Sequence, residues 1–220
     1  FWYFSFRQNL KEEIFKRQKN IAEETMHNLE ELIREKLRFL IVYSELSDIL
    51  IFSEFGEKKE DVLTQLRRIS LQDKDLTEIS ILNRKGKEII KIDARQEPFY
   101  EVPEEELADR SKEVKFFTPT YRIPKEYQSE LYFSNDGKPK ITLAIPLTFP
   151  KTPRELERLT KTEPRFITVV GIKPEEVLGV LTVEVNLERI FQEITKKEIG
   201  REGYLYLVDA DHKIFAHPDE

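Results

Sequence analysis

The sequence predicts an α+β protein in which a long N-terminal helix is followed by an antiparallel sheet flanked by shorter helices. Three observations support this class. Residues 7–43 contain no proline or glycine and carry apolar side chains at helical spacing. Later segments alternate between polar and apolar residues, as strands with one buried face do. Helical patterns lie on either side of these strand segments, an order typical of α+β proteins.

The N-terminal helix is predicted to extend beyond a single domain, because its uninterrupted segment would span about 55 Å at 1.5 Å per residue. We expect residues 1–46 to form a stalk that either lies against one domain or pairs in a dimeric coiled coil. Five of the first six residues are aromatic, and Arg7 and Lys11 follow. This pattern is typical of a membrane interface, so the chain is expected to be an excerpt that starts near a membrane. A short aromatic segment packed on its own core is the alternative.

Two further helices are predicted in the middle of the chain. Residues 48–56 are interpreted as a break, after which residues 59–71 carry apolar side chains at helical spacing. Pro103 precedes three glutamates, which favour the positive end of a helix. This helix is predicted to end before Pro119.

The predicted strands are bounded by turn residues. They cover residues 77–82, 87–92, 130–134, 140–147, 165–172 and 177–185. The first two form a hairpin, and a polar, proline-bounded insertion at 151–164 separates two of the later ones. Asn186 is predicted to cap a helix that runs to about residue 197. A last hairpin follows at 204–208 and 213–216.

Composition disfavours several classes of protein. The net charge is −6, and the 36 basic and 42 acidic residues are interspersed, whereas broad nucleic-acid binding needs basic residues gathered on one face. The chain contains no cysteine, which rules out disulfides and thiolate metal sites but leaves the compartment open. No apolar run reaches the length of about 18 residues that a membrane-spanning helix needs.

A series of short motifs follows one another along the chain, at 71–82, 86–89, 109–111, 127–134, 137–146, 179–187, 203–209 and 214–218. In this order and spacing the motifs resemble the double Cache domain, the extracytoplasmic PAS-like sensor module of bacterial histidine kinases and chemoreceptors. The resemblance implies a membrane-distal PAS-like subdomain with its exit helix at 47–198. It also implies an incomplete membrane-proximal subdomain at 199–220, the start of a second PAS-like unit.

The resemblance further implies a small-molecule pocket in the membrane-distal subdomain. Its predicted ligand-binding residues are Arg110, Phe116, Tyr121, Tyr127, Ser129 and Tyr132. Arg110 offers a planar fork to a carboxylate, and the tyrosines supply walls and hydroxyl groups. A solvated helix residue is the alternative for Arg110. Strand alternation puts Tyr127 and Ser129 on one face and Tyr132 on the other unless a bulge intervenes.

The resemblance is incomplete where amino-acid-binding members carry a Thr, Tyr and Asp series. This chain has Ser129, Tyr132 and Ser134 at similar spacing, so the carboxylate that would pair a ligand ammonium is absent. An α-amino acid ligand is therefore disfavoured.

Enzymatic functions find little support in the sequence. His212 and His217 lack the glutamate and third ligand of a metalloenzyme site, and no phosphate-binding loop, nucleophile elbow or kinase signature is present. We therefore expect no catalytic residue, no metal and no cofactor in this segment, although the parent protein is expected to be a kinase or chemoreceptor.

Two hypotheses remain. In the first, the chain is the periplasmic or extracellular ligand-sensing domain of a membrane-anchored receptor, which binds a small molecule and passes a conformational change through its N-terminal helix. In the second, it is a dimerisation or spacer module of the same receptor type without a ligand. A homodimer through the N-terminal helix is expected in both, and nucleic acid in neither.

Overall fold

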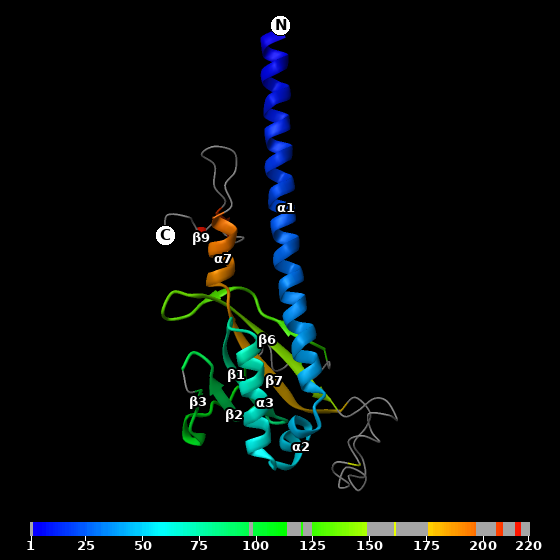
Figure 1. Ribbon diagram of the computed structural model, residues 1–220, viewed down its shortest axis with the longest axis vertical. Coiled ribbons are helices and arrows are strands. Elements are labelled where there is room, and N and C mark those ends of the chain that lie inside the picture. The colour runs from blue at the N-terminus through cyan, green and yellow to red at the C-terminus, as the bar shows by residue number, and fades with distance from the viewer. Residues whose placement is uncertain are drawn as a thin grey trace. The chain divides into compact units, whose positions relative to one another are not determined.

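The computed structural model describes residues 2–96, 99–113, 120, 125–148, 161, 176–196, 206–208 and 214–216 (Figure 1). The chain divides into two compact units, Phe1–Phe39 and Leu40–Glu220. Helix α1 (Trp2–Ser44) forms the first unit and contributes its last turn to the second. The predicted long N-terminal helix is thus confirmed. Among the described helices, none carries a stretch apolar and long enough to span a bilayer.

Two short helices follow, α2 (Ser47–Phe55) and α3 (Lys59–Gln72). The sequence predicted α3 correctly, but the predicted break over residues 48–56 is wrong. Segment α2 has four consecutive buried apolar residues, Ile49 to Phe52. Such a run has no helical period and does not predict an amphipathic helix. The helix is stabilised instead by packing of these side chains against the rest of the fold. Gly56 follows the last helical residue and caps the helix in the left-handed conformation.

An antiparallel sheet forms the centre of the second unit. Within the described residues it has seven strands in the spatial order β3-β2-β1-β7-β6-β4, with β5 also paired to β6. The strands are β1 (Leu76–Asn83), β2 (Glu88–Asp93), β3 (Tyr100–Glu101), β4 (Tyr127–Gln128), β5 (Tyr132–Phe133), β6 (Pro139–Thr148) and β7 (Val177–Asn186). The α+β class and the β1–β2 hairpin are confirmed.

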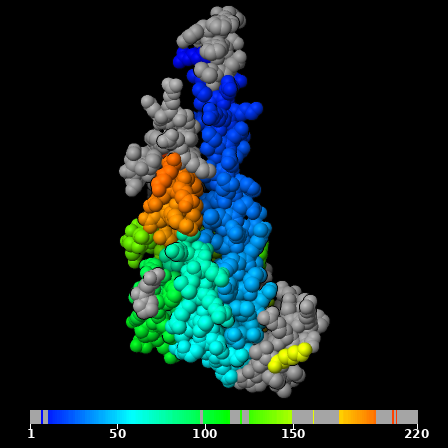
Figure 2. All heavy atoms as spheres, viewed as in Figure 1, coloured from blue at the N-terminus to red at the C-terminus, as the bar shows by residue number. Residues whose placement is uncertain are grey.

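One face of this sheet is the apolar core. Its central strands contribute buried side chains that include Ile79, Ile81, Leu143, Leu181 and Val183. Helices α2 and α3 pack against the sheet and add their own buried residues, among them Ile49, Val62, Leu66 and Ile69 (Figure 1). Helix α3, cyan in Figure 2, forms part of the surface that this view shows. Burial of these side chains at roughly 1.5–3 kcal/mol each is the main stabilising contribution.

The predicted helix that starts after Pro103 is wrong within the described residues. Only a 3-10 turn, η1 (Glu104–Glu106), forms there. The chain then pairs with the edge of β2, because the Glu88 N–H donates to the Ala108 carbonyl at 2.9 Å. Hydrogen bonds of this kind replace those that a helix would make. Residues 114–119 lie outside the described residues.

The C-terminal elements follow the predicted order. Helix α7 (Glu188–Thr195) starts after Asn186, whose side-chain oxygen accepts the Glu188 N–H at 2.8 Å. Strands β8 (Leu207–Val208) and β9 (Ile214–Ala216) form the last predicted hairpin. The predicted insertion at 151–164 lies outside the described residues except for residue 161, and the predicted strand at 165–172 lies wholly outside them.

Gly179 allows α2 to approach the sheet closely. A Cβ atom at this position would collide with the carbonyl oxygen of Leu82 and the hydroxyl of Ser53, which itself donates to the Leu178 carbonyl at 3.1 Å. We predict that Gly179→Ala lowers the free energy of unfolding by about 1–3 kcal/mol, the usual cost of overpacking. Urea unfolding monitored by circular dichroism measures this change.

The matched control is Leu71→Ala, which truncates a side chain that is 65% exposed at the end of α3. This control should change the unfolding free energy by less than about 0.5 kcal/mol. A Gly179→Ala protein as stable as the wild type would show that α2 does not pack as described.

Candidate functional site

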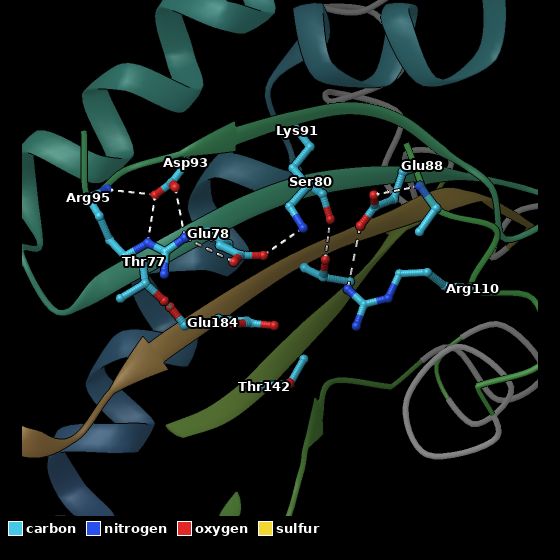
Figure 3. A network of polar contacts seen from close by, with 12 residues as sticks. Thr77, Glu78, Ser80, Glu88, Lys91, Asp93, Arg95, Arg110, Thr142 and Glu184 are labelled. Carbon is cyan, nitrogen blue, oxygen red and sulfur yellow. Dashed lines mark hydrogen bonds and ion pairs between the residues drawn. The ribbon is translucent and has the colours of Figure 1, made fainter. Parts of the chain in front are cut away.

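The second face of the sheet carries a row of buried polar side chains (Figure 3). This polar face includes Ser80, Glu88, Lys140, Thr142 and Thr182, none of which is more than 5% exposed. Antiparallel register aligns them, since Ser80 lies opposite Thr182 and Glu184 lies opposite Thr142. Buried polar groups destabilise a fold unless they are hydrogen-bonded. A face built from such residues is therefore a candidate binding surface.

Hydrogen bonds satisfy the middle of the polar face. The hydroxyls of Ser80 and Thr182 are 2.7 Å apart, and the Lys140 ammonium donates to the Glu184 carboxylate at 2.9 Å. These side chains come from three neighbouring strands, so they also hold the strands in register. The sequence analysis missed Lys140, Thr142, Thr182 and Glu184, since each lies in a strand whose partner it could not identify.

The structure brings Tyr127 and Tyr132 to the same face of the sheet. Tyr127 lies opposite Ala144 and Tyr132 lies opposite Lys140, two positions on the same side of β6. Regular strand alternation would put Tyr132 on the opposite face from Tyr127. The chain leaves regular pairing between β4 and β5, and this irregularity brings both side chains to one face. The side chain and backbone of Ser129 bond to Thr142 within this break.

Tyr132, in β5, reaches the polar face at Thr142. Its hydroxyl is 3.2 Å from the Thr142 hydroxyl. Burial raises the pKa of Tyr132 to about 12, and the negative charge of Glu184 adds to this rise against the lowering effect of the Thr142 hydrogen bond. The phenol therefore stays protonated at neutral pH and can donate a hydrogen bond.

Backbone hydrogen bonds hold Arg110 over the edge of this face. Its N–H donates to the Gly86 carbonyl at 2.8 Å. Gly86 is required here because a Cβ atom would lie 2.6 Å from the Cα of Ser111. The Arg110 side chain is only 16% exposed, so Arg110 is not the solvated helix residue of the alternative interpretation.

The Arg110 guanidinium lies between two carboxylates. Its Nε and Nη2 donate to the two oxygens of Glu113 at 2.9 and 3.0 Å, and its Nη1 is 3.5 Å from Glu88 Oε1. Burial lowers the pKa of Arg110, but the hydrogen bonds and charge of Glu113, together with the charge of Glu88, raise it overall. The guanidinium is therefore permanently charged.

Glu88 is the most deeply buried acid of this group. It is 1% exposed, and its Oε2 accepts the Ala108 N–H at 3.0 Å. Its Oε1 has no hydrogen-bond partner among the described residues and faces Arg110 (Figure 3). The sequence analysis did not single out Glu88. The strand also carries Lys91 and Asp93, so nothing in the sequence sets Glu88 apart from the other charged residues of β2.

An apolar cluster borders the polar groups. Leu82, Ala144 and Val180 are fully buried on the same side of the sheet, and Tyr127 packs against them. An apolar wall beside a few polar groups is typical of small-molecule sites. Of the predicted site residues, Arg110, Tyr127, Ser129 and Tyr132 thus lie on or beside this face. Phe116 and Tyr121 lie outside the described residues.

No group of three or more side chains suited to a metal ion occurs within the described part of the chain. His212 and His217 lie outside that part.

A family model for the Cache domain, dCache_1, matches residues 6–220. The chain belongs to the double Cache family. The match confirms the resemblance that the ordered motifs indicated, and it covers nearly the whole chain. Cache domains of receptors are extracytoplasmic sensor domains, and this segment resembles a sensor rather than a catalytic domain. No curated protein matches the sequence.

Solved structures share the double Cache fold at low sequence identity. The sensory domain of the Campylobacter jejuni chemoreceptor Tlp3 aligns with a TM-score of 0.62 at 14% identity, over 95% of this chain and 73% of that one. The Tlp3 ligand-binding domain in complex with 4-methylisoleucine aligns with a TM-score of 0.57 at 14% identity, over 93% and 69% of the two chains. The extracellular domain of the proposed histidine kinase vpHK1S-Z8 aligns with a TM-score of 0.55 at 15% identity, over 92% and 70%.

A second ionic group lies at the end of β2. Arg95 donates to both carboxylate oxygens of Asp93 at 2.9 and 2.8 Å, and Lys91 pairs with Glu78 at 2.6 Å (Figure 3). Hydrogen bonds from Arg95 lower the pKa of Asp93 to about 2, against the raising effect of burial. This carboxylate therefore remains ionised well below the pH at which an ordinary aspartate titrates.

We predict that Asp93→Asn removes an acid-dependent part of the stability. Because the folded pKa of Asp93 is depressed, its contribution is complete above about pH 4 and is lost as the pH falls towards 2. The variant should be about 1–2 kcal/mol less stable than wild type at neutral pH, a value reduced because Arg95 is half exposed. Urea unfolding at a series of pH values measures the difference.

The control is Glu105→Gln, which removes one negative charge from the exposed turn η1. It should leave the pH profile between 4 and 2 close to that of the wild type. A loss in Asp93→Asn that stays constant over this range would contradict the pairing with Arg95.

Proposed function

We propose that this chain is the extracytoplasmic ligand-sensing domain of a transmembrane signal-transduction receptor, located in the periplasm or extracellular space. Its ligand is a small molecule bound on the polar face of the distal sheet. The observation that carries this proposal is the guanidinium of Arg110, held largely out of water beside Glu88 of that face. The ligand bound by the related Tlp3 domain is also a small molecule.

A carboxylate is the proposed group that Arg110 recognises. The guanidinium already holds the carboxylate of Glu113 through two parallel hydrogen bonds, so its fork has the geometry for a bidentate contact. Tyr132 and Ser129 supply hydroxyl groups, and Tyr127 supplies an apolar wall. Phe116 and Tyr121 complete the proposed site.

We propose that α1 carries the signal towards the membrane. Its last turn is connected to α3, since the Tyr43 hydroxyl donates to Gln72 at 3.2 Å. Helix α3 in turn packs on the sheet that holds the proposed site. A ligand that binds one arrangement of this sheet more tightly shifts the population of the whole domain. The proposed borders are 1–46 for the stalk, 47–198 for the distal subdomain and 199–220 for the proximal subdomain.

A spacer module without a ligand is the second candidate function. It is favoured by the pairing of polar groups within the face, such as Lys140 with Glu184 and Arg110 with Glu113. Groups that are satisfied internally do not need a ligand.

We predict that a thermal-shift screen of small carboxylates and other metabolites finds a compound that raises the melting temperature of the wild-type domain. Arg110→Gln should abolish this rise because the ionic contact is lost, and Tyr132→Phe should weaken binding by about tenfold through the loss of one hydrogen bond. The affinity is measured by isothermal titration calorimetry.

The matched control for Tyr132→Phe is Tyr100→Phe, at an exposed tyrosine of β3. This variant should bind as the wild type does. A screen without any specific stabilisation favours the spacer function instead, and a hit that tolerates Arg110→Gln removes Arg110 from the site.

We also propose that two copies of the chain associate through α1. Ile14, Phe15 and Met26 are exposed on this helix, and Phe15 reaches 69%. Apolar side chains exposed along a long helix are typical of helix–helix interfaces. The parent protein is accordingly proposed to be a membrane-anchored homodimer, with kinase or chemoreceptor output.

We predict that the domain shows a concentration-dependent dimer in sedimentation equilibrium, and that Phe15→Glu weakens it at least tenfold because it places a charge in an apolar seam. Lys16→Glu, which changes the charge at the neighbouring position, is the control and should have a smaller effect. A wild-type domain that is monomeric at all accessible concentrations would contradict pairing through α1.

A further inference from the structure

Glu113 already occupies the fork of Arg110 that the proposed ligand would use. The two carboxylate oxygens accept from Nε and Nη2 at 2.9 and 3.0 Å, which is the bidentate geometry of a bound carboxylate. A ligand carboxylate at this fork must therefore replace another carboxylate rather than fill an open position.

Of the two acids that pair with Arg110 within the described part of the chain, Glu113 is the one that can exchange easily with a ligand. The Glu88 side chain is 1% exposed and accepts the Ala108 N–H, so its removal would leave this part-buried backbone donor without that partner. The Glu113 side chain is 46% exposed, and water can solvate its carboxylate when it leaves. Glu88 therefore stays as the fixed counter-charge and Glu113 is the mobile one.

The tether between Glu113 and Arg110 is short. The Glu113 N–H donates to the Arg110 carbonyl at 3.0 Å, so the two residues are three positions apart in a closed turn. A group on so short a tether competes with an effective concentration of about millimolar or higher. A free monocarboxylate must overcome this competition with contacts of its own.

The position of Arg110 does not depend on Glu113. Hydrogen bonds from the Arg110 N–H to the Gly86 carbonyl and from the Glu88 N–H to the Ala108 carbonyl hold the backbone on either side. Substitution of Glu113 is therefore expected to open the fork without moving the guanidinium away from the polar face.

We propose that Glu113 is an internal competitor for the ligand carboxylate and thereby sets the intrinsic affinity that an acid needs before it binds at Arg110. Simple acids that offer only a carboxylate, such as acetate, make too few contacts to displace Glu113 from Arg110. Acids whose remaining atoms contact Tyr132, Thr142 or the apolar cluster displace Glu113. This inference rests on the proposed function, in which Arg110 recognises a carboxylate.

The test compares acetate with an acid found in the thermal-shift screen, using wild type, Glu113→Gln and Glu113→Ala. Both variants should bind acetate about tenfold more tightly than wild type or better, because the competing charge-assisted contact is gone. The gain for the larger acid should be similar, because the same competing contact is removed for both acids. The double variant Arg110→Gln/Glu113→Gln should lose acetate binding, and Glu105→Gln, the control for a lost charge, should bind as wild type does.

A second measurement covers the case in which the variants do not fold. In the wild-type domain, the Nε–H resonance of Arg110, assigned by its loss in Arg110→Lys, and the side-chain carboxyl carbon resonance of Glu113 are followed by NMR during a titration with the larger acid. The exchange requires both resonances to shift together. A shift at Arg110 with an unchanged Glu113 resonance overturns the inference.

The outcomes separate the two proposals. Acid binding that needs Arg110 but is not strengthened by either Glu113 variant overturns the competitor role and leaves the proposed function standing. Absence of any Arg110-dependent acid binding in wild type and in both variants overturns the proposed recognition of a carboxylate by Arg110, and the inference with it.

Discussion

The register of three neighbouring strands, β1, β7 and β6, is the constraint on which the rest of the structure depends. Glu184 of β7 lies between Glu78 of β1 and Thr142 of β6 in the register of the sheet. This register gathers polar side chains on one face and apolar side chains on the other. Because the side-chain period of a strand is two residues, a slip of one position would move the apolar set into the polar face. The helical layer and the proposed site both exist only in this register.

Burial of polar groups on one face of the sheet costs desolvation free energy, which hydrogen bonds and ion pairs between these groups offset. Lys140 with Glu184 and Ser80 with Thr182 connect adjacent strands and reinforce the same register. Such groups contribute less net stability than an apolar core of equal volume would, since desolvation cancels much of their attraction. Their presence is understandable if the face must recognise a polar ligand or hold the fork of Arg110 in place.

Irregular backbone brings the remaining residues of the site together. The break between β4 and β5 returns Tyr132 to the side of the sheet that holds Tyr127. Pairing of residues 108–110 with the β1–β2 turn and β2 places Arg110 beside Glu88. Two short departures from regular structure therefore create the polar face as a candidate site, while the regular strands supply its floor.

The sequence by itself determined the α+β class, the long first helix, the β1–β2 hairpin, the central strands and, through the order of its motifs, the double Cache family. These features depend on local periodicity, turn residues and motif spacing. It failed for α2, whose consecutive apolar residues have no period, and for the helix expected after Pro103, where pairing with β2 prevails. It also could not identify Glu88, Lys140 or Glu184 as neighbours of Arg110 and Tyr132. Only the tertiary structure decided these contacts, because strand register and pairing at the sheet edge join residues far apart in the chain.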